Sequence, residues 1–286
     1  MPTAPTALIH NENNLRLAVL IDADNAPRNS IKGIMEEVAI YGTPTLKRIY
    51  GDWTNPCVAG WKASLLENAI VPIQQYAYTT GKNSTDSAMI IDAMDILYSG
   101  NVDGFVLVSS DSDFTRLAIR LREAGMLVIG IGEKKTPSPF IVACNKFIYI
   151  EVIRSRNIPE PEATPVKAEK KPSGSRKRTD SKSSKKEPDQ KQPQPEPKQD
   201  KKLIPPEIIS HIADSVSDLT EDEDGVFMGE LGTLLIKKQP DFDCRNFGFK
   251  SLTAMIKSID RFGVELRQTS DPHIKHPYVR DKEASE

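Results

Sequence analysis

The strongest constraint on the fold is a series of short apolar runs in the first half of the chain, separated by stretches with helical periodicity. The runs lie at residues 17–21, 46–50, 70–74, 105–109, 127–131 and 147–150. Most of them are continuously apolar instead of alternating with polar residues, which is typical of strands buried on both faces. Strands that alternate with helices predict an α/β fold in which helices sandwich a parallel sheet.

The composition changes abruptly at about residue 154. From there to residue 202 the chain is rich in Pro, Lys, Ser, Gln and Glu and contains almost no large apolar residues. Such a segment cannot bury enough surface to offset the entropy cost of ordering, so we expect it to be disordered. It holds about fifteen basic and about eight acidic residues. The formal net charge of -2 for the whole chain therefore hides a basic linker between acidic flanks.

Helical periodicity returns at residue 203. Helices are expected at 205–216, 226–237 and 249–259, followed by two short extended pieces at 264–267 and 278–280. Three helices and a hairpin are the pattern of a winged helix. The sequence thus predicts a flexible N-terminal tail (1–15), an α/β domain (16–153), a disordered basic linker (154–202) and a small winged-helix domain (203–282).

Neither a membrane segment nor a disulfide framework is indicated. No apolar run approaches the roughly 18 residues that cross a bilayer. The 3 cysteines, Cys57, Cys144 and Cys244, lie far apart and form no C-x-x-C motif. We expect a protein of the reducing cytoplasm that is not bound to a membrane; the sequence gives no indication of oligomeric state.

Polar side chains follow two of the predicted strands at the points where they end. After the first strand, the motif I-D-A-D-N supplies Asp22, Asp24 and Asn25. After the fourth, S-S-D-S-D supplies Ser110, Asp111 and Asp113. Ligands of open parallel sheets bind outside the carboxyl ends of the strands, so both groups are candidates for a site.

A further carboxylate comes from the start of a predicted helix. Asp86 shares a helical face with Ile90 and Ala93, which are expected to pack on the sheet. If the first and fourth strands are neighbours, Asp86 converges with the acids at their ends. Carboxylates that lie this close repel one another and need a cation.

The nature of the cation follows from the residues that are missing. No histidine lies between residues 11 and 209, and no cysteines are paired in sequence, so the site has only oxygen ligands. Oxygen ligands favour Mg²⁺ or Mn²⁺, which commonly meet a phosphate substrate. The absence of histidine also excludes a Ser-His-Asp arrangement. The remaining chemistry is hydrolysis of a phosphodiester or a phosphate ester by water that a metal ion activates.

Simpler interpretations of the same residues stay open. Asp111, Ser112 or Asp113 is a suitable N-cap for the helix expected at 117–121, and Asp24 is a suitable cap for the helix after the first strand. I-D-A-D-N also contains the D-x-D pattern of haloacid-dehalogenase-type phosphatases, in which Asp22 would be the nucleophile, although Ala26 departs from that pattern.

Three lysines are candidates for phosphate contacts or for ordinary loop residues. Lys82 precedes the helix of Asp86, and Lys134 and Lys135 follow the fifth strand in G-I-G-E-K-K-T-P-S-P-F. Ser138-Pro139 in this motif looks like an N-cap with proline in the first helical position. A lone G-x-G is equally compatible with a plain turn.

Four motifs in one order, I-D-A-D-N, K-N-S-T-D-S-A-M-I-I-D-A-M-D, V-S-S-D-S-D-F and A-G-M-L-V-I-G-I-G, resemble the NYN domain family, relatives of PIN-domain ribonucleases. The resemblance covers residues 16–153. It implies a PIN-like sandwich with a carboxylate cluster that holds Mg²⁺ or Mn²⁺ for RNA cleavage. The residues that it implies for catalysis and metal binding are Asp22, Asp86, Asp111 and Asp113, with Asp24 as a further ligand. Those expected to bind substrate are Asn25, Lys82, Ser110, Lys134 and Lys135.

The C-terminal segment resembles a LOTUS domain, also called an OST-type helix-turn-helix, in D-E-D-G-V-F-M-G-E-L-G, Q-P-D-F-D and F-G-F-K-S-L-T-A-M-I. The resemblance implies an association with RNA. From residue 203 onwards, however, about ten basic residues face about sixteen acidic ones, which is unfavourable for a duplex binder. A local basic face of Lys250, Lys257, Arg261 and Arg267 stays open, with Phe247 and Phe249 either as stacking residues or as core.

These features together predict a Mg²⁺- or Mn²⁺-dependent endoribonuclease, a hydrolase, with a C-terminal RNA-targeting domain. Its expected partners are RNA and a protein bound by the C-terminal domain. The alternative is a non-catalytic RNA-binding adaptor in which the acidic cluster is a relic or a structural metal site.

Overall fold

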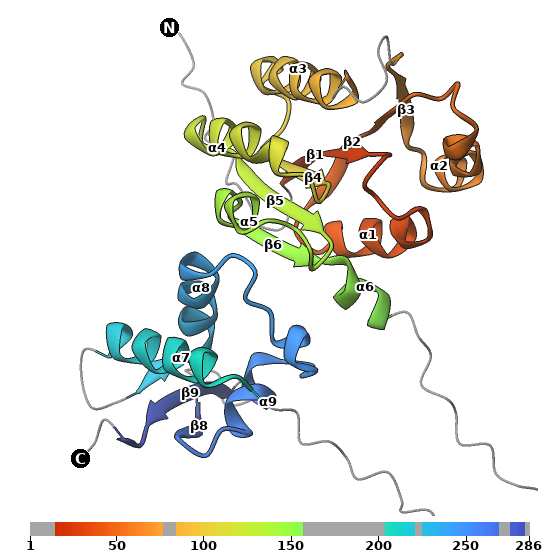
Figure 1. The fold of residues 1–286 in the computed structure, drawn as a ribbon. Helices are drawn as coiled ribbons and strands as arrows, with labels where there is room; N and C mark the ends of the chain where they lie inside the picture. Colours follow the sequence, from red (N-terminus) through yellow and green to blue (C-terminus); the bar gives the residue numbers. More distant parts are fainter. Residues whose placement is uncertain (1–14, 77–83, 157–203, 221–224, 269–274, 284–286) are drawn as a thin grey trace, which may run out of the picture. The chain divides into compact units, whose positions relative to one another are not determined.

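The computed structural model describes residues 15–76, 84–156, 204–220, 225–268 and 275–283 (Figure 1). The helices and strands fall in an N-terminal part, 15–156, and a C-terminal part, 204–283. Within the described residues no helix is both long and apolar enough to cross a membrane.

The N-terminal part contains a parallel sheet of six strands, as predicted. Its strands are β1 (Arg16–Asp22), β2 (Thr43–Gly51), β3 (Val71–Gln74), β4 (Gly104–Val108), β5 (Leu127–Gly132) and β6 (Lys146–Tyr149). Their order in the sheet is β3-β2-β1-β4-β5-β6, and every neighbouring pair is parallel. β1 and β4 are therefore neighbours, which brings the acids at their carboxyl ends together.

Helices cover both faces of this sheet. On one face lie α1 (Ile31–Val38), α2 (Lys62–Asn68) and α6 (Ile150–Arg156); on the other lie α3 (Ser84–Ser99), α4 (Thr115–Glu123) and α5 (Ser138–Ala143). In β1, Leu17, Val19 and Ile21 face the first layer, whereas Ala18 and Leu20 face the second. Burial on both sides explains why the strand is continuously apolar.

Three local predictions in this part are wrong. Pro137, not Ser138, precedes α5 as its N-cap, because Pro137 has extended backbone (φ -62°, ψ 139°) and the helix already begins at Ser138. Asp24 caps no helix; Pro27 and Ser30 occupy the cap positions of the short 3-10 helix η2 (Arg28–Ser30) and of α1. Finally, α6 continues to Arg156, so residues 154–156 of the predicted linker are helical.

The C-terminal part has the helices and small sheet of the predicted winged helix. The helices are α7 (Pro206–Leu219), α8 (Met228–Lys238) and α9 (Leu252–Lys257), with a 3-10 turn, η5, at Cys244–Phe247. The antiparallel sheet has the order β7-β9-β8, from β7 (Val226–Phe227), β9 (Lys275–Asp281) and β8 (Phe262–Gln268).

Two of the helix predictions for this part need correction. Val226 and Phe227 form a strand instead of a first helical turn, because they pair with Val279 and Tyr278 of β9. The third helix begins only at Leu252. Ser251 has extended backbone and its hydroxyl accepts a hydrogen bond from Ala254 N (3.2 Å), which fixes the start of α9.

Candidate metal centre

Asp22, the last residue of β1, is buried, with 1 % of its surface exposed. Its Oδ1 accepts a hydrogen bond from Asp24 N (3.0 Å), and its Oδ2 accepts from Asn25 Nδ2 (2.7 Å) and from Ser109 Oγ (2.9 Å). A buried carboxylate needs such donors to offset its desolvation. These donors fix its orientation at the end of the strand.

A second group of acids lies where β4 ends. Asp111 Oδ1 accepts a hydrogen bond from Asp113 N (2.9 Å), so Asp111 caps the 3-10 turn η4 (Ser112–Phe114). The prediction that one of these residues caps the helix itself is wrong, because α4 begins at Thr115 and its N-cap is Phe114. Capping and ligand binding are compatible, because a carboxylate has two oxygens and several lone pairs.

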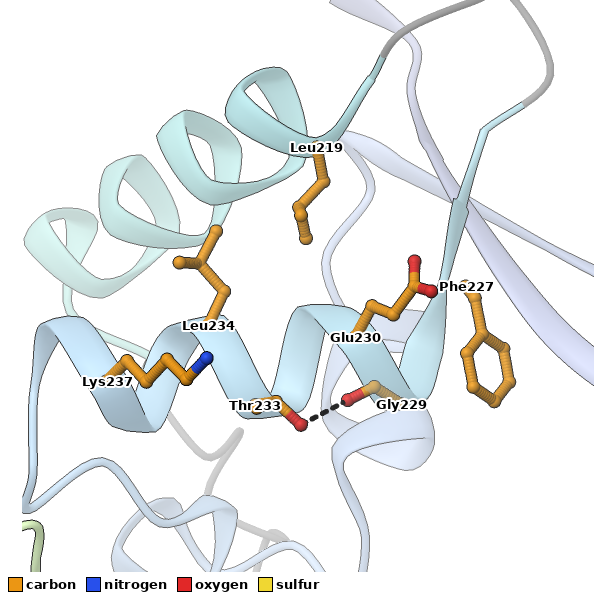
Figure 2. Close-up of a pocket in the computed structure, with 7 residues that line it drawn as sticks. All are labelled: Leu219, Phe227, Gly229, Glu230, Thr233, Leu234 and Lys237. Atoms are coloured by element: carbon orange, nitrogen blue, oxygen red, sulfur yellow. Dashed lines mark hydrogen bonds between the residues drawn. The ribbon is translucent and has the colours of Figure 1, made fainter.

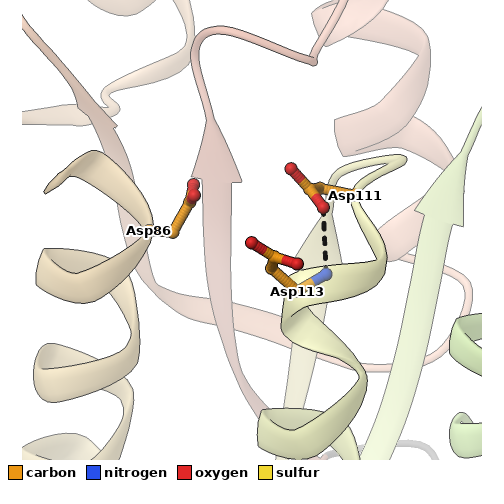
Figure 3. A group of neighbouring side chains, drawn as sticks. All are labelled: Asp86, Asp111 and Asp113. Carbon is orange, nitrogen blue, oxygen red and sulfur yellow. Dashed lines mark hydrogen bonds between the residues drawn. The ribbon is translucent and has the colours of Figure 1, made fainter. Parts of the chain in front are cut away.

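Asp86 approaches these residues from the first turn of α3. The side chains of Asp86, Asp111 and Asp113 each offer an oxygen, and these three oxygens lie within 4.8 Å of one another (Figure 3). Asp86 and Asp111 are half-buried and Asp113 is exposed. Among the described residues, no other group of His, Cys, Asp or Glu side chains has this spacing.

The electrostatics of the cluster are unfavourable without a cation. The pKa of Asp86 is raised to about 6, chiefly by burial and then by the nearby negative charges of Asp22, Asp111, Asp113 and Asp24. The pKa of Asp24 is also raised, chiefly by burial and then by Asp22. A positive ion between these groups would remove the repulsion.

The donor set fits a small, hard cation. Mg²⁺ would hold oxygen ligands at about 2.1 Å, so any two oxygens bound to one ion would lie no more than about 4.2 Å apart. A small inward movement of side chains that already lie within 4.8 Å would reach this geometry. Neither histidine nor cysteine belongs to the cluster, which favours Mg²⁺ or Mn²⁺ over softer metals.

The residues expected to bind substrate lie in different environments. Asn25 donates to Asp22, and Ser110 is buried, with its hydroxyl accepting from Glu133 N (2.9 Å). Lys135 pairs with Glu133 (2.7 Å), and the Lys134 side chain is exposed. Lys82 lies outside the described residues.

Aromatic and basic side chains of β7, β8 and β9 lie next to one another in the C-terminal sheet. The ring of Phe227 lies 5.2 Å from that of His276 and 5.8 Å from that of Tyr278, measured between centroids. Arg267 lies 4.5 Å from the centre of the Tyr278 ring. We call Phe227, Arg267, His276 and Tyr278 the aromatic sheet face.

The basic face considered from the sequence is arranged differently. Arg261 is held by Asp281 through hydrogen bonds of 2.7 to 3.0 Å and lies 5.9 Å from the centre of the Phe262 ring. Arg267 lies against Tyr278 and 3.8 Å from Glu265. Phe247 and Phe249 pack against the core, so the interpretation of both as core residues is confirmed.

A cavity of about 520 Å³ lies between the end of α7, β7 and α8. Figure 2 shows Leu219 and Leu234 pointing into the space between the two helices. A Cβ at Gly229 would lie 2.6 Å from the ring of Phe227, so a larger residue here would displace that ring. With Glu230 and Lys237 as its charged lining residues, the cavity holds no cluster suited to catalysis.

Comparison with known families decides what this pair of domains is. Residues 16–151 match the NYN domain family, and residues 198–274 match the OST-HTH/LOTUS domain family. The chain is an NYN domain protein with a C-terminal LOTUS domain. The combination of a PIN-like nuclease fold with an RNA-associated domain supports a role as a ribonuclease or in RNA binding.

Two solved structures are similar to parts of this chain. A protein of unknown function from Vibrio parahaemolyticus is 18% identical, covering 50% of this chain and 96% of its own, with a TM-score of 0.42. An uncharacterized protein from Nitrosomonas europaea is 32% identical, covering 33% of this chain and 91% of its own, with a TM-score of 0.26. No curated protein matches the chain significantly.

Two residues of the NYN domain site were not predicted. Ser109 ties the two strand ends together, since its hydroxyl donates to Asp22 and accepts from Asp111 N (3.0 Å). Asp52 directly follows β2 and contributes to the raised pKa of Asp24. The rule that identified Asp22 and Asp111, an acid immediately after a strand, would also have identified Asp52.

In the NYN domain, a polar contact with β2 also holds α3 in place. Asp92 of α3 accepts hydrogen bonds from Arg48 and Tyr50, which both belong to β2. Tyr50 is fully buried, and burial together with Asp92 raises the pKa of its hydroxyl far above the usual range. Asp92 therefore has a structural role, because it holds α3 against β2.

Proposed function

We propose that this protein is a divalent-metal-dependent endoribonuclease whose active site is the acidic cluster of the NYN domain. The observation that carries the proposal is the convergence of Asp86, Asp111 and Asp113 within 4.8 Å, at the carboxyl edge of a PIN-like sheet. Three carboxylates at this spacing repel one another, and this repulsion favours a bound cation.

In the proposed site, Asp86, Asp111 and Asp113 hold one Mg²⁺ or Mn²⁺ ion. When bound, the ion supplies an activated water and stabilises charge on the oxygens of the phosphodiester. Asp22 accepts three hydrogen bonds, which orient it at the end of β1, and it contributes negative charge beside the cluster.

RNA targeting is assigned to the LOTUS domain and the basic linker. The aromatic sheet face combines rings on which bases stack with an arginine that attracts phosphate, a combination suited to single-stranded RNA. Tethering by the linker raises the local concentration of bound RNA at the NYN domain. A protein partner of the LOTUS domain is compatible with this arrangement.

The direct test is cleavage of end-labelled single-stranded RNA by the purified full chain in Mg²⁺, Mn²⁺ or EDTA. We expect metal-dependent cleavage that falls at least about tenfold in Asp86→Asn and in Asp111→Asn, since each change removes a charged ligand. Asp95→Asn is the matched control, because Asp95 is an exposed aspartate on the same helix as Asp86.

The outcome also distinguishes the nuclease from the second candidate function, a non-catalytic RNA-binding adaptor. RNA binding without turnover in any of these metals would favour the non-catalytic adaptor, in which Asp111 serves as a cap and Asp22 as a structural carboxylate. Cleavage that survives both aspartate changes would point to a contaminating nuclease and would remove this site from the mechanism.

A further inference from the structure

Two arginines line a cleft of the NYN domain that the proposed catalytic site does not use. The cleft has a volume of about 380 Å³ and is lined by Pro27, Arg28, Asn29, Trp61 and Arg154. Arg28 and Asn29 come from η2, Arg154 from α6, and Trp61 from the end of the 3-10 turn η3 (Pro56–Trp61). The size is in the range of small-ligand sites, which run from about 300 to 1,000 Å³.

The guanidinium groups are held in place without being neutralised. Arg154 Nε donates to the buried hydroxyl of Ser30 (2.8 Å), which leaves its two terminal nitrogens for a ligand. Arg28 lies over the backbone of Gly60, so closely that a Cβ there would come within 1.5 Å of Arg28 Nη1. Across the described ranges, no carboxylate forms an ion pair with Arg28 or Arg154.

Two cations that line one cleft without a counter-charge repel each other. An anion in the cleft would reverse this cost, and guanidinium forks match the geometry of a phosphate oxygen pair better than any other side chain does. The Asn29 amide adds a neutral donor at the same opening. The chemistry of the cleft is therefore that of a phosphate site.

The position of the cleft relates it to the acidic cluster. Arg28 follows Asp22 by six residues, so their Cα atoms lie at most about 20 Å apart, the length of a fully extended chain of that size. The chain folds back between them, since Ala26 N donates to Asp22 O (2.9 Å) and Ser30 N donates to Pro27 O (2.9 Å). α6 follows β6 directly, so the cleft and the cluster share the carboxyl edge of the sheet.

We infer that the arginine cleft binds a backbone phosphate of single-stranded RNA, a few nucleotides from the bond at the acidic cluster. The inference rests on the proposed function in taking RNA as the ligand, and it adds a second anchoring point on the NYN domain. Such an anchor would set the direction in which the RNA strand crosses the edge of the sheet, while the acidic cluster acts on a different phosphate.

The test measures RNA binding instead of cleavage. The full chain carrying Asp111→Asn, which is expected to lower turnover at least about tenfold, is titrated in EDTA with a fluorescent single-stranded RNA at several KCl concentrations. In this background, Arg28→Ala/Arg154→Ala is expected to raise the Kd at least about tenfold. The slope of log Kd against log salt should fall by about 0.7 for each phosphate contact that is lost.

Two further variants test whether loss of charge or loss of folding, instead of loss of the cleft, causes the weaker RNA binding. Arg16→Ala/Arg120→Ala removes the same number of charges from an exposed position at the start of β1 and a partly exposed one late in α4, and it should change neither the Kd nor the slope. Gly60→Ala keeps the full charge but displaces the Arg28 guanidinium. It should weaken binding while the melting temperature stays unchanged.

The inference is overturned if the two double variants lose affinity equally, or if neither Arg28→Ala/Arg154→Ala nor Gly60→Ala weakens binding. These results are independent of the cleavage assay. If the protein with an intact cluster fails to cleave RNA while the arginine variants still lose binding, the nuclease proposal fails and the phosphate site stands as part of an RNA-binding adaptor.

Discussion

Ser109 Oγ donates a hydrogen bond to Asp22 Oδ2 (2.9 Å), and this contact joins the carboxyl ends of two neighbouring strands, β1 and β4. The same hydroxyl accepts from Asp111 N (3.0 Å). One buried side chain thus sets the separation of two acidic segments that come from distant parts of the sequence. The acidic site depends on it although it carries no charge.

The first prediction concerns Ser109→Ala. Without the hydroxyl, Asp111 N loses its acceptor and Asp22 loses one of its donors, so we expect the free energy of unfolding to fall by about 1–3 kcal/mol. Urea unfolding measures the change. Ser112→Ala, at an exposed position of η4, is the control and should be nearly neutral. Equal stabilities of the two variants would show that the hydroxyl does not hold the strand ends.

The second prediction concerns the pH dependence of the metal-free protein. The pKa of Asp86 is raised from 3.8 to about 6, so between these values the folded state binds more protons than the unfolded state. The free energy of unfolding should therefore decrease as the pH rises from about 4 to about 6. Each pKa unit corresponds to about 1.4 kcal/mol, and solvent screening of this half-exposed group reduces the total to about 1–2 kcal/mol.

The variant Asp86→Asn removes this titration. In EDTA at neutral pH it should be more stable than the parent by a similar amount, and the decrease between pH 4 and pH 6 should be smaller. Denaturant unfolding across this pH range, compared with Asp95→Asn, gives the answer. A parent protein whose stability rises throughout that window would show that Asp86 is not raised in pKa.

The third prediction is that Mn²⁺ stabilises the folded protein through the cluster. A ligand that binds only the folded state adds about 2.7 kcal/mol when its concentration is a hundred times its Kd. Thermal unfolding with and without Mn²⁺ should show this gain for the parent and lose it for Asp111→Asn. The same rise in melting temperature in both proteins would place the bound ion elsewhere.

The general position of the site could be predicted from the sequence, but its internal support could not. Continuously apolar strands require helices on both faces, and acids directly after β1 and β4 require a shared edge, so Asp22, Asp86 and Asp111 were expected to converge. Ser109 had no such signal, because a serine at the end of a strand is equally suited to solvent. Its role exists only once β1 and β4 are neighbours.

Strand pairing between distant parts of the sequence explains why the predicted helix bounds in the C-terminal domain are wrong. Val226 and Phe227 precede the apolar pattern of α8 without a break, so helical periodicity included them. Their strand forms by pairing with β9, about 50 residues later in the chain, which no local pattern contains. The contact of Arg267 with Tyr278 likewise depends on the pairing of β8 with β9.

The fourth prediction concerns the support of α3, which carries Asp86. Tyr50→Phe removes one of the two donors to Asp92, and we expect it to lower the free energy of unfolding by about 1–3 kcal/mol. If this contact also positions the helix, the affinity for Mn²⁺ should fall. Titration with Mn²⁺ separates the two effects, because a purely structural role would leave the affinity unchanged. Tyr98→Phe, on the same helix but 74% exposed, is the control.

The fifth prediction concerns RNA binding by the LOTUS domain. Tyr278 lies between Phe227 and Arg267 on the aromatic sheet face, so Tyr278→Ala removes the central ring of this surface. Loss of one stacked base costs about 1–3 kcal/mol, which corresponds to a five- to about 150-fold increase in the Kd for single-stranded RNA. Fluorescence anisotropy with the full chain measures it. Leu266→Ala, an exposed apolar residue of β8, is the control. If Tyr278→Ala binds RNA as tightly as that control does, the aromatic sheet face is not the RNA-binding surface, and the basic linker or the NYN domain carries the affinity instead.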